Sequence, residues 1–303
     1  MEYVLQTFDI VKKYNKQKAL AGVNMNIQKG DIYGFVGENG SGKTTIIRLI
    51  TGLIFADEGN YELFGVSNKD KKILQSRKKV GAVVETPSIY RNMTAYENLK
   101  TQCLLLGVND ENKIKEVLET VGLADLYDSK KQAGNFSLGM RQRLGIAMAL
   151  LNEPEFLILD EPMNGLDPEG IVSMRELIIH LNKNKNITFL ISSHILTELS
   201  LIANRYGIIS KGKIIKEISY EDMKKECRKS LYIQTQDIEK LVKVVEGLEV
   251  DVLSNGVKVY GDISINELLN KIIKAKVKID SINSNESSLE EYYLDVIRGE
   301  HHG

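Results

Sequence analysis

The segment that most constrains the fold is a glycine-rich stretch between an apolar run and a helical pattern. Residues 37–44 read Gly-Glu-Asn-Gly-Ser-Gly-Lys-Thr, which matches the pattern G-x-x-x-x-G-K-[ST]. Its glycines let backbone N–H groups converge on phosphate oxygens, and the helix that follows presents its positive end. An ordinary glycine-rich turn is the alternative. A predicted strand at Asp31–Val36 and a predicted helix at Thr44–Ile50, which ends at Gly52, favour a phosphate-binding loop.

Other apolar runs indicate a parallel sheet. Phe156–Leu159 and Ile187–Ile191 show no alternation of apolar and polar residues, which is typical of strands buried on both faces. Gly170–Asn182, between them, has helical periodicity. Tyr3–Val11 and Val23–Ile27 do alternate, like half-buried strands. Strands that alternate with helices predict an α/β fold.

A helical subdomain is predicted inside this α/β core, over about residues 87–151. Helices are expected at Ala95–Leu106, Glu111–Val121 and Leu138–Leu151. These segments lie between the phosphate loop and the apolar strand at Phe156–Leu159, so they form an insertion into the α/β core.

The composition changes after about residue 219, where Lys, Glu, Ile and Val become more frequent. The order of predicted elements is βαββαβα, which is that of a small ferredoxin-like α+β domain with an extra helix. Asn255-Gly256 predicts a type I′ turn within a hairpin. The elements are strand Ser230–Thr235, helix Ile238–Glu246, hairpin Asp251–Tyr260, helix Ile265–Lys274, strand Val277–Ile282 and helix Leu289–Ile297.

Charge and composition exclude several classes of protein. The chain of 303 residues has 40 Lys and Arg against 41 Asp and Glu, which argues against a generally basic nucleic-acid-binding protein. It lacks a signal-peptide pattern, and no apolar run approaches the roughly 18 residues that span a bilayer. Cys103 and Cys227 are too few for a disulfide framework, so a reducing compartment fits. We expect a soluble chain with no nucleic-acid partner and no direct membrane insertion.

Three polar residues follow the two apolar runs. Asp160 is suited to orient Mg²⁺ or its water, and Glu161 to polarise, as a general base, a water that attacks a phosphate. A solvated acidic turn before Pro162 is the alternative. His194 ends the next strand, either as a solvated strand-end histidine or as a hydrogen-bond donor that senses a γ-phosphate.

Together these motifs resemble the nucleotide-binding subunit of ATP-binding-cassette (ABC) transporters. Residues 136–144, Phe-Ser-Leu-Gly-Met-Arg-Gln-Arg-Leu, are similar to the signature motif of that family. Asn164–Pro168 looks like its D-loop and Ser193-His194 like its H-loop. Tyr14 stands where the family places an aromatic residue that stacks on adenine. The resemblance covers about residues 2–217.

The resemblance implies a P-loop NTPase with a RecA-like core, an antiparallel β subdomain and a helical insert. Residues 1–218 would be the ATPase domain and 219–303 an accessory α+β domain. The motifs and the resemblance imply catalytic roles for Lys43, Glu161 and His194, and magnesium ligands at Thr44, Glu85 and Asp160. The expected nucleotide contacts are Tyr14, Gly37, Glu38, Asn39, Gly40, Ser41, Gly42, Lys43, Thr44, Thr45, Ser137, Gly139 and Asp167.

The resemblance also implies partners. Two subunits would close over ATP, each presenting Ser137 and Gly139 to the γ-phosphate held by the other, and we expect a homodimer, with a heterodimer as the alternative. An integral membrane permease would hold the dimer at the cytoplasmic face of the membrane. Ser88, Ile89, Tyr90 and Met93 are expected to line a groove for a permease helix, unless Tyr90 and Met93 belong to the core.

Two departures from the family pattern narrow the expected function. The signature reads Phe-Ser-Leu-Gly-Met where the family has Leu-Ser-Gly-Gly-Gln, and Glu85 replaces the usual glutamine. With the C-terminal domain, these features are similar to exporters for bacitracin resistance and lantibiotic immunity. We therefore expect ATP hydrolysis coupled to peptide-antibiotic export. An importer ATPase with a regulatory C-terminal domain and a non-transport ABC ATPase are the alternatives.

Overall fold

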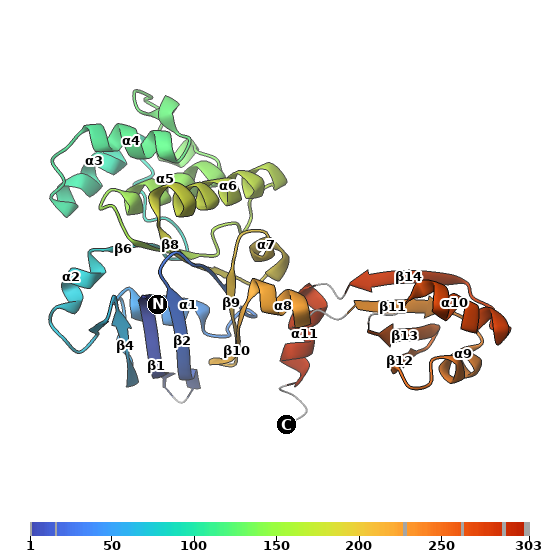
Figure 1. The fold of residues 1–303 in the computed structure, drawn as a ribbon. Helices are drawn as coiled ribbons and strands as arrows, with labels where there is room; N and C mark the ends of the chain where they lie inside the picture. Colours follow the sequence, from blue (N-terminus) through green and yellow to red (C-terminus); the bar gives the residue numbers. More distant parts are fainter. Residues whose placement is uncertain (1, 16, 227–228, 262–263, 287–288, 300–303) are drawn as a thin grey trace. The chain divides into compact units, whose positions relative to one another are not determined.

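The computed structural model describes residues 2–15, 17–226, 229–261, 264–286 and 289–299 (Figure 1). The chain divides into two compact units, which we call unit 1 (Met1–Tyr220) and unit 2 (Glu221–Gly303). The sequence places the corresponding boundary between residues 218 and 219. Cys227 lies outside the described residues.

A six-stranded sheet forms the centre of unit 1. Its order is β10-β9-β3-β8-β7-β6, in which β10 is antiparallel to β9 and the other strands are parallel. Every residue of β3, β7 and β8 is buried, as the continuous apolar runs predict. The strands are β3 Ile32–Val36, β6 Val80–Val83, β7 Phe156–Asp160, β8 Thr188–Ser193, β9 Arg205–Ser210 and β10 Lys213–Ser219.

A second, antiparallel sheet packs with the first around helix α1 (Lys43–Ile50). Its order is β2-β1-β4-β5, which confirms the antiparallel β subdomain that the family resemblance implies. Ile46 and Ile50 of α1 share one core with Val4 of β1 and Phe156 of β7, so the helix lies between the sheets. The strands are β1 Tyr3–Tyr14, β2 Gln17–Gln28, β4 Glu58–Leu63 and β5 Val66–Ser67.

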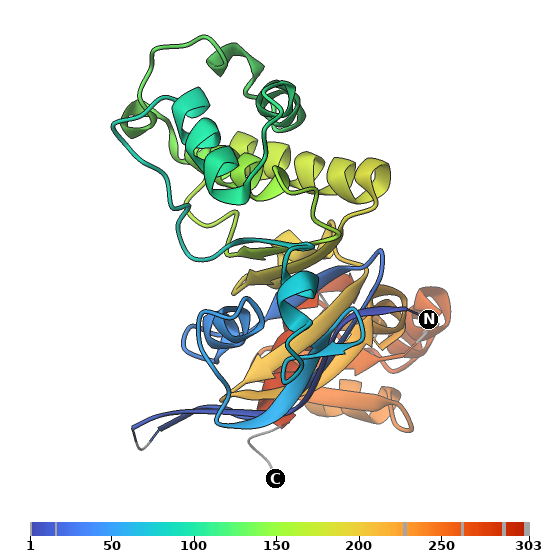
Figure 2. The same ribbon diagram turned by 90° about the vertical axis from the view of Figure 1, so that its left-hand side faces the viewer.

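The predicted helical insertion is present. Helices α3 (Ala95–Leu106), α4 (Asn112–Thr120) and α5 (Leu138–Leu150) lie with α6 (Pro168–Lys185) at one end of unit 1, as the turned view in Figure 2 also shows. α3 has the predicted bounds because Thr94 and Glu97 form a capping box at its start and Gly107 ends it in a left-handed conformation. Unit 1 also contains two short α-helices, α2 (Ile73–Arg77) and α7 (Leu196–Ser200), and two 3-10 helices, η1 (Ala124–Leu126) and η2 (Ala133–Asn135). Helix α8 (Tyr220–Glu226) follows them.

Unit 2 has the predicted ferredoxin-like topology. Its sheet order β12-β13-β11-β14 is antiparallel throughout, and α9 and α10 contribute Leu241, Leu268 and Ile272 to the core. The elements are β11 Lys229–Gln234, α9 Ile238–Val244, β12 Glu249–Leu253, β13 Gly256–Tyr260, α10 Ile265–Lys274, β14 Ser281–Glu286 and α11 Leu289–Gly299.

Two local predictions for unit 2 are wrong. The hairpin forms, but its turn is not type I′, because neither Asn255 nor Gly256 has a positive φ. Gly256 is needed for a close approach instead, since a Cβ there would lie 2.4 Å from the carbonyl oxygen of Ile233. The last strand begins at Ser281 rather than Val277, because Val277 packs into the core from the preceding loop.

Candidate functional site

Three adjacent parallel strands bring the predicted site residues together. β3, β8 and β7 are neighbours in the sheet and run in one direction, so their carboxyl ends meet at one edge. The phosphate loop follows β3, Asp160 ends β7, and His194 follows β8. Residues far apart in sequence therefore converge at this edge, which is where open α/β sheets bind ligands.

The phosphate loop is tightly seated against the rest of unit 1. Gly40 and Gly42 have φ values of 81° and 114°, which favour glycine. A Cβ at Gly37 would lie 2.4 Å from the carbonyl oxygen of Ile209. The Ser41 hydroxyl is buried and has no hydrogen-bond partner within the described residues. A buried polar group of this kind fits a loop that binds phosphate oxygens.

Lys43 is held in place by the loop itself. Its side chain is 6% exposed, and its Nζ donates to the carbonyl oxygens of Gly37 at 2.6 Å and Glu38 at 3.3 Å. The same Nζ lies 3.4 Å from Oε1 of Glu161. The ammonium group is therefore fixed between the loop and the acidic pair.

Asp160 lies inside the sheet rather than in a solvated turn. It is 2% exposed, which rules out the alternative of a solvated acidic turn for this residue. Thr44 Oγ1 donates to its Oδ2 at 2.9 Å, and Ser192 Oγ donates to its Oδ1 at 2.5 Å. Ser192 was not predicted as a site residue, although it ends the strand that pairs with Asp160.

The pair Thr44 and Asp160 suits Mg²⁺. A hydroxyl and a carboxylate are hard oxygen donors, and magnesium is usually held by one or two protein ligands together with phosphates and waters. No group of three or more His, Cys, Asp or Glu side chains in the described ranges forms a complete metal site. The donor set therefore fits a metal that arrives with its nucleotide.

Glu161 has a constrained backbone and two polar neighbours, Lys43 and His194. Its φ is 51°, which is uncommon for a residue with a side chain. Its backbone N–H donates to Ser192 Oγ at 2.9 Å, and its Oε2 lies 2.8 Å from Nδ1 of His194. This arrangement directs one carboxylate oxygen to His194 and the other to Lys43. Nearby, burial raises the pKa of the Glu198 carboxyl, and the Glu161 charge raises it further.

Tyr14 lies beside the phosphate loop. A cavity of about 350 Å³ is lined by Tyr14 together with Gly40 and Thr45, and by Lys18 and Lys211. Tyr14 is 45% exposed, and Nζ of Lys12 lies 5.7 Å from the centroid of its ring. An exposed aromatic side chain beside the phosphate loop suits a planar ligand.

The signature motif and the D-loop meet at a separate cavity of about 530 Å³. Ser137 caps α5 by accepting from the Met140 N–H at 3.2 Å, and Asp167 caps α6 by accepting from the Gly170 N–H at 2.9 Å. Both motifs thus end at helix N-termini, which attract anions. Gly139 also lines this cavity. The phosphate loop contributes none of the residues that line it.

Glu85 forms an ion pair with Arg48 of α1. Its φ is 59°, and its side chain is 55% exposed. The structure therefore brings Thr44 and Asp160 together but directs Glu85 to Arg48. Glu85 and Ser88 line a groove of about 710 Å³ between β6 and α5. Ile89, Tyr90 and Met93 do not line this groove, and neither Tyr90 nor Met93 is buried.

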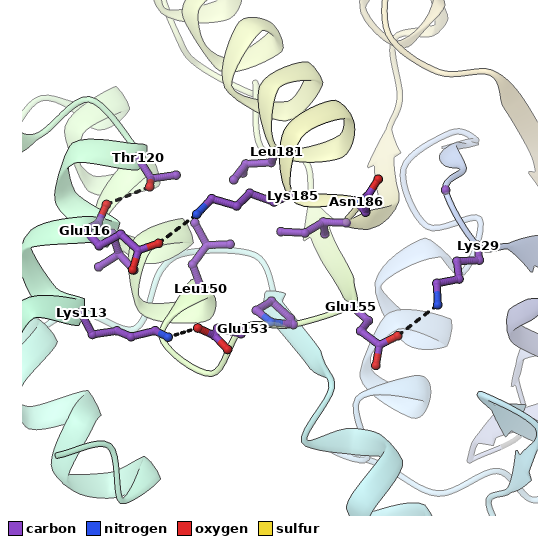
Figure 3. A pocket seen from close by; sticks show the side chains of 14 residues that line it. Lys29, Lys113, Glu116, Thr120, Leu150, Glu153, Glu155, Leu181, Lys185 and Asn186 are labelled. Carbon is purple, nitrogen blue, oxygen red and sulfur yellow. Dashed lines mark hydrogen bonds and ion pairs between the residues drawn. The ribbon is translucent and has the colours of Figure 1, made fainter. Parts of the chain in front are cut away.

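A further cavity of about 690 Å³ lies between α4, the end of α5 and the end of α6 (Figure 3). Ion pairs cross it: Lys185 with Glu116 at 2.9 Å, Lys113 with Glu153, and Lys29 with Glu155 at 3.5 Å. Each lysine faces a carboxylate, so the cavity has balanced charge.

Comparison with known proteins identifies the family. The family model described as "ABC transporter" matches residues 20–164. The chain is 44% identical to the bacitracin transport ATP-binding protein BcrA of Bacillus licheniformis, over 99% of both chains. The chain belongs to the ABC transporter family. It is an ATP-hydrolysing subunit of that family, coupled to transport.

Other relatives match about three quarters of this ABC transporter subunit. It is 43% identical to the lantibiotic transport ATP-binding protein SrtF of Streptococcus pyogenes, over 72% of this chain and 92% of the relative. The ADP conformation of MJ1267, an ATP-binding cassette of an ABC transporter, superposes with a TM-score of 0.64 and 31% identity, over 73% of this chain and 92% of that one. Of the helices in the described ranges, none is both long and apolar enough to cross a bilayer.

Proposed function

We propose that this subunit energises an exporter of a peptide antibiotic such as bacitracin or a lantibiotic, and so confers resistance or immunity. The observation that carries the proposal is the match to BcrA over 99% of both chains. That match includes unit 2, whereas the match to SrtF covers 72% of this chain.

Within one subunit, the phosphate loop would bind the triphosphate. Lys43 would contact the β- and γ-phosphates, and Thr44 and Asp160 would hold Mg²⁺. When bound, the metal offsets negative charge on the phosphate oxygens. Glu85 would have to leave Arg48 before it could serve as a further ligand. Tyr14 would stack on the adenine ring.

Glu161 would act as the general base. Its carboxylate would accept a proton from the water that attacks the γ-phosphate, while the hydrogen bond to His194 keeps it oriented. The Lys43 ammonium lies 3.4 Å from the other oxygen of this carboxylate and would help to hold it in place. His194 would thus link the base to the end of β8.

A second copy would complete each site. Ser137 and Gly139 line a different cavity from the phosphate loop, which supports a role in contacting nucleotide held by a partner subunit. ATP would stabilise the closed dimer, because its γ-phosphate makes contacts that exist only when both copies are present. Hydrolysis would remove these contacts and reopen the dimer.

A membrane permease would dock at the groove between β6 and α5. Leu53, Leu74 and Leu106 provide apolar lining. Glu85 also lines the groove, and its partner Arg48 lies in α1, the helix that follows the phosphate loop. This arrangement would hold the subunit at the cytoplasmic face of the membrane. Crosslinking from Ser88 to the permease is the expected outcome, and a scan of the groove with no crosslink would contradict this docking site.

The proposed function is tested by reconstitution. The full chain and its cognate permease, in vesicles, should show ATPase activity that rises when bacitracin or a lantibiotic is added. The same complex with Lys43→Ala is the control and should not respond. Stimulation by neither peptide, in a complex that still hydrolyses ATP, would contradict the proposed substrate class.

A further inference from the structure

Arg143 connects three segments of unit 1. It lies in α5, C-terminal to the signature residue Gly139. Its Nη1 donates to the carbonyl oxygen of Val121 at 2.8 Å, and its Nη2 donates to Oγ of Ser173. Val121 is the C-cap residue of α4, and Ser173 lies in α6, the helix that begins at the D-loop. One guanidinium group therefore links the signature helix α5 to the end of α4 and to α6.

The end of α4 is shaped to receive this guanidinium group. The Gly122 N–H donates to Glu119 O at 3.0 Å and the Leu123 N–H to Leu118 O at 2.8 Å, which is a Schellman arrangement. A cation near helix carbonyls is favourable. Gly122 has a φ of 70°, and a Cβ there would lie 2.6 Å from Nη1 of Arg143. Glycine is thus required for the conformation and for the contact.

The signature and the D-loop also touch at their N-terminal ends. A Cβ at Gly165 would lie 3.2 Å from Cδ2 of Leu138, and a Cβ at Gly139 would lie 3.7 Å from Cδ2 of Leu166. Leu138 is one of the departures from the family signature, and here it packs against the D-loop. α5 and α6 are therefore in contact at two places: at their N-terminal ends, through Leu138 and Leu166, and nearer their middles, where Arg143 binds Ser173. Helices joined at two points resist independent rotation.

We infer that Arg143 is a positioning residue that holds the signature motif and the D-loop in a fixed mutual orientation, so that both reach the nucleotide of a partner subunit together. The inference rests on the proposed function, in which Ser137 and Gly139 act across a dimer. The residues expected to bind nucleotide within one subunit, such as Lys43 and Asp160, lie on other elements. Loss of Arg143 should therefore impair dimer closure and leave nucleotide binding to the subunit's own phosphate loop intact.

The test uses the full chain with Glu161→Gln as background, in which ATP should hold the dimer closed. Adding Arg143→Met should raise the dimer dissociation constant in MgATP on the order of tenfold or more, measured by sedimentation, because a hydrogen-bonded charge is removed. The affinity of the dilute subunit for ATP should change by less than about twofold, because Arg143 and the phosphate loop lie on different elements and share no contact. Arg143→Lys, which can reach only one acceptor, should have a dimer dissociation constant between those of the Glu161→Gln background and of Arg143→Met.

Arg77→Met is the matched control, because Arg77 also donates from a part-buried site, to Tyr61 at 2.6 Å, but lies in α2. It should leave dimer formation unchanged. Ser173→Ala tests the same link if Arg143→Met fails to fold. Normal dimer formation by Ser173→Ala and Arg143→Met, or a parallel loss of ATP affinity and dimer formation, would overturn the inference. Failure of the Glu161→Gln background to form a dimer would instead contradict the proposed function.

Discussion

At the scale of single residues, the site depends on how Glu161 is held. The left-handed backbone at Glu161 costs free energy, and its N–H bond to Ser192 and its contact with His194 offset that cost. Ser192 serves two neighbours, because its hydroxyl donates to Asp160 and accepts from Glu161. The carboxylates of the two acids therefore have separate partners and separate expected roles.

Replacing Glu161 by glutamine should separate binding from hydrolysis. The amide preserves the shape of the side chain but cannot accept a proton, so phosphate release should fall roughly 10²–10⁴-fold. ATP binding should persist, because Lys43 and the phosphate loop are unchanged. Phosphate release near the normal rate would show that Glu161 is not the base.

Replacing Lys43 by alanine should weaken nucleotide binding directly. The substitution removes the ammonium group that lies between the loop carbonyls and Glu161. Titration calorimetry should show an ATP affinity reduced on the order of tenfold or more. Lys29→Ala, at the balanced cavity of Figure 3, is the control and should bind ATP normally. Equal affinities in the two variants would rule out the assigned role of Lys43.

At the scale of elements, ion pairs connect the helical insertion to the rest of unit 1. Lys185 at the end of α6 reaches Glu116 of α4, and Lys113 of α4 reaches Glu153 after α5. These side chains are partly exposed, and exposed pairs of this kind typically contribute about 0.2–1 kcal/mol. They orient the helices without making a large contribution to stability.

The contribution of Glu116 should depend on pH. Its hydrogen bond from Lys185, together with the charge of that lysine, lowers the pKa of the Glu116 carboxyl below its ordinary value of 4.5. An acid with a lowered folded-state pKa stabilises the fold above its unfolded pKa, and this stabilisation is lost as the pH falls through the folded value. At pH 7, Glu116→Gln should therefore melt slightly below the parent protein, by a Tm shift that corresponds to roughly 0.2–1 kcal/mol.

Thermal melts across pH check this expectation. The difference in Tm between Glu116→Gln and the parent should shrink as the pH falls below 4.5. Glu119→Gln is the control, because Glu119 lies on the same helix and forms no ion pair within the part of the chain that the structure describes. A Tm difference that stays constant across this range would argue against the pair with Lys185.

At the scale of the whole molecule, the proposed nucleotide site belongs to unit 1. The phosphate loop, Asp160, Glu161 and His194 all lie before Tyr220, and unit 1 has its own core around α1. Unit 2 has a separate core of its own. Each unit therefore has the interior expected of an independent domain.

A fragment of residues 1–220 should fold and bind ATP. Its affinity should lie within about threefold of the full chain, since no proposed ATP contact is removed. Circular dichroism and titration calorimetry check the two parts of this expectation. A fragment that folds but binds no ATP would show that unit 2 contributes to the site.

Local sequence signals predicted the elements whose signals are strong. The bounds of α3 follow from its capping box and Gly107, β7 and β8 follow from uninterrupted apolar runs, and β3 was predicted from the apolar residues that lead into the phosphate loop. β6, β9 and β10 were not predicted, because β6 is only four residues long and β9 and β10 carry no continuous apolar run or regular alternation. These strands exist because neighbouring strands supply their hydrogen-bond partners, which no local pattern encodes.

The sequence by itself determined which chemical groups this protein has and the order of its motifs, since glycine conformations, caps and buried strands are properties of short segments. Only the tertiary structure decided that Asp160 is buried and bound to Ser192, that Glu85 turns to Arg48, and that Arg143 joins three helices. The reason is that these contacts join residues from different elements, and their geometry is fixed by the packing of sheets and helices rather than by neighbours in the chain.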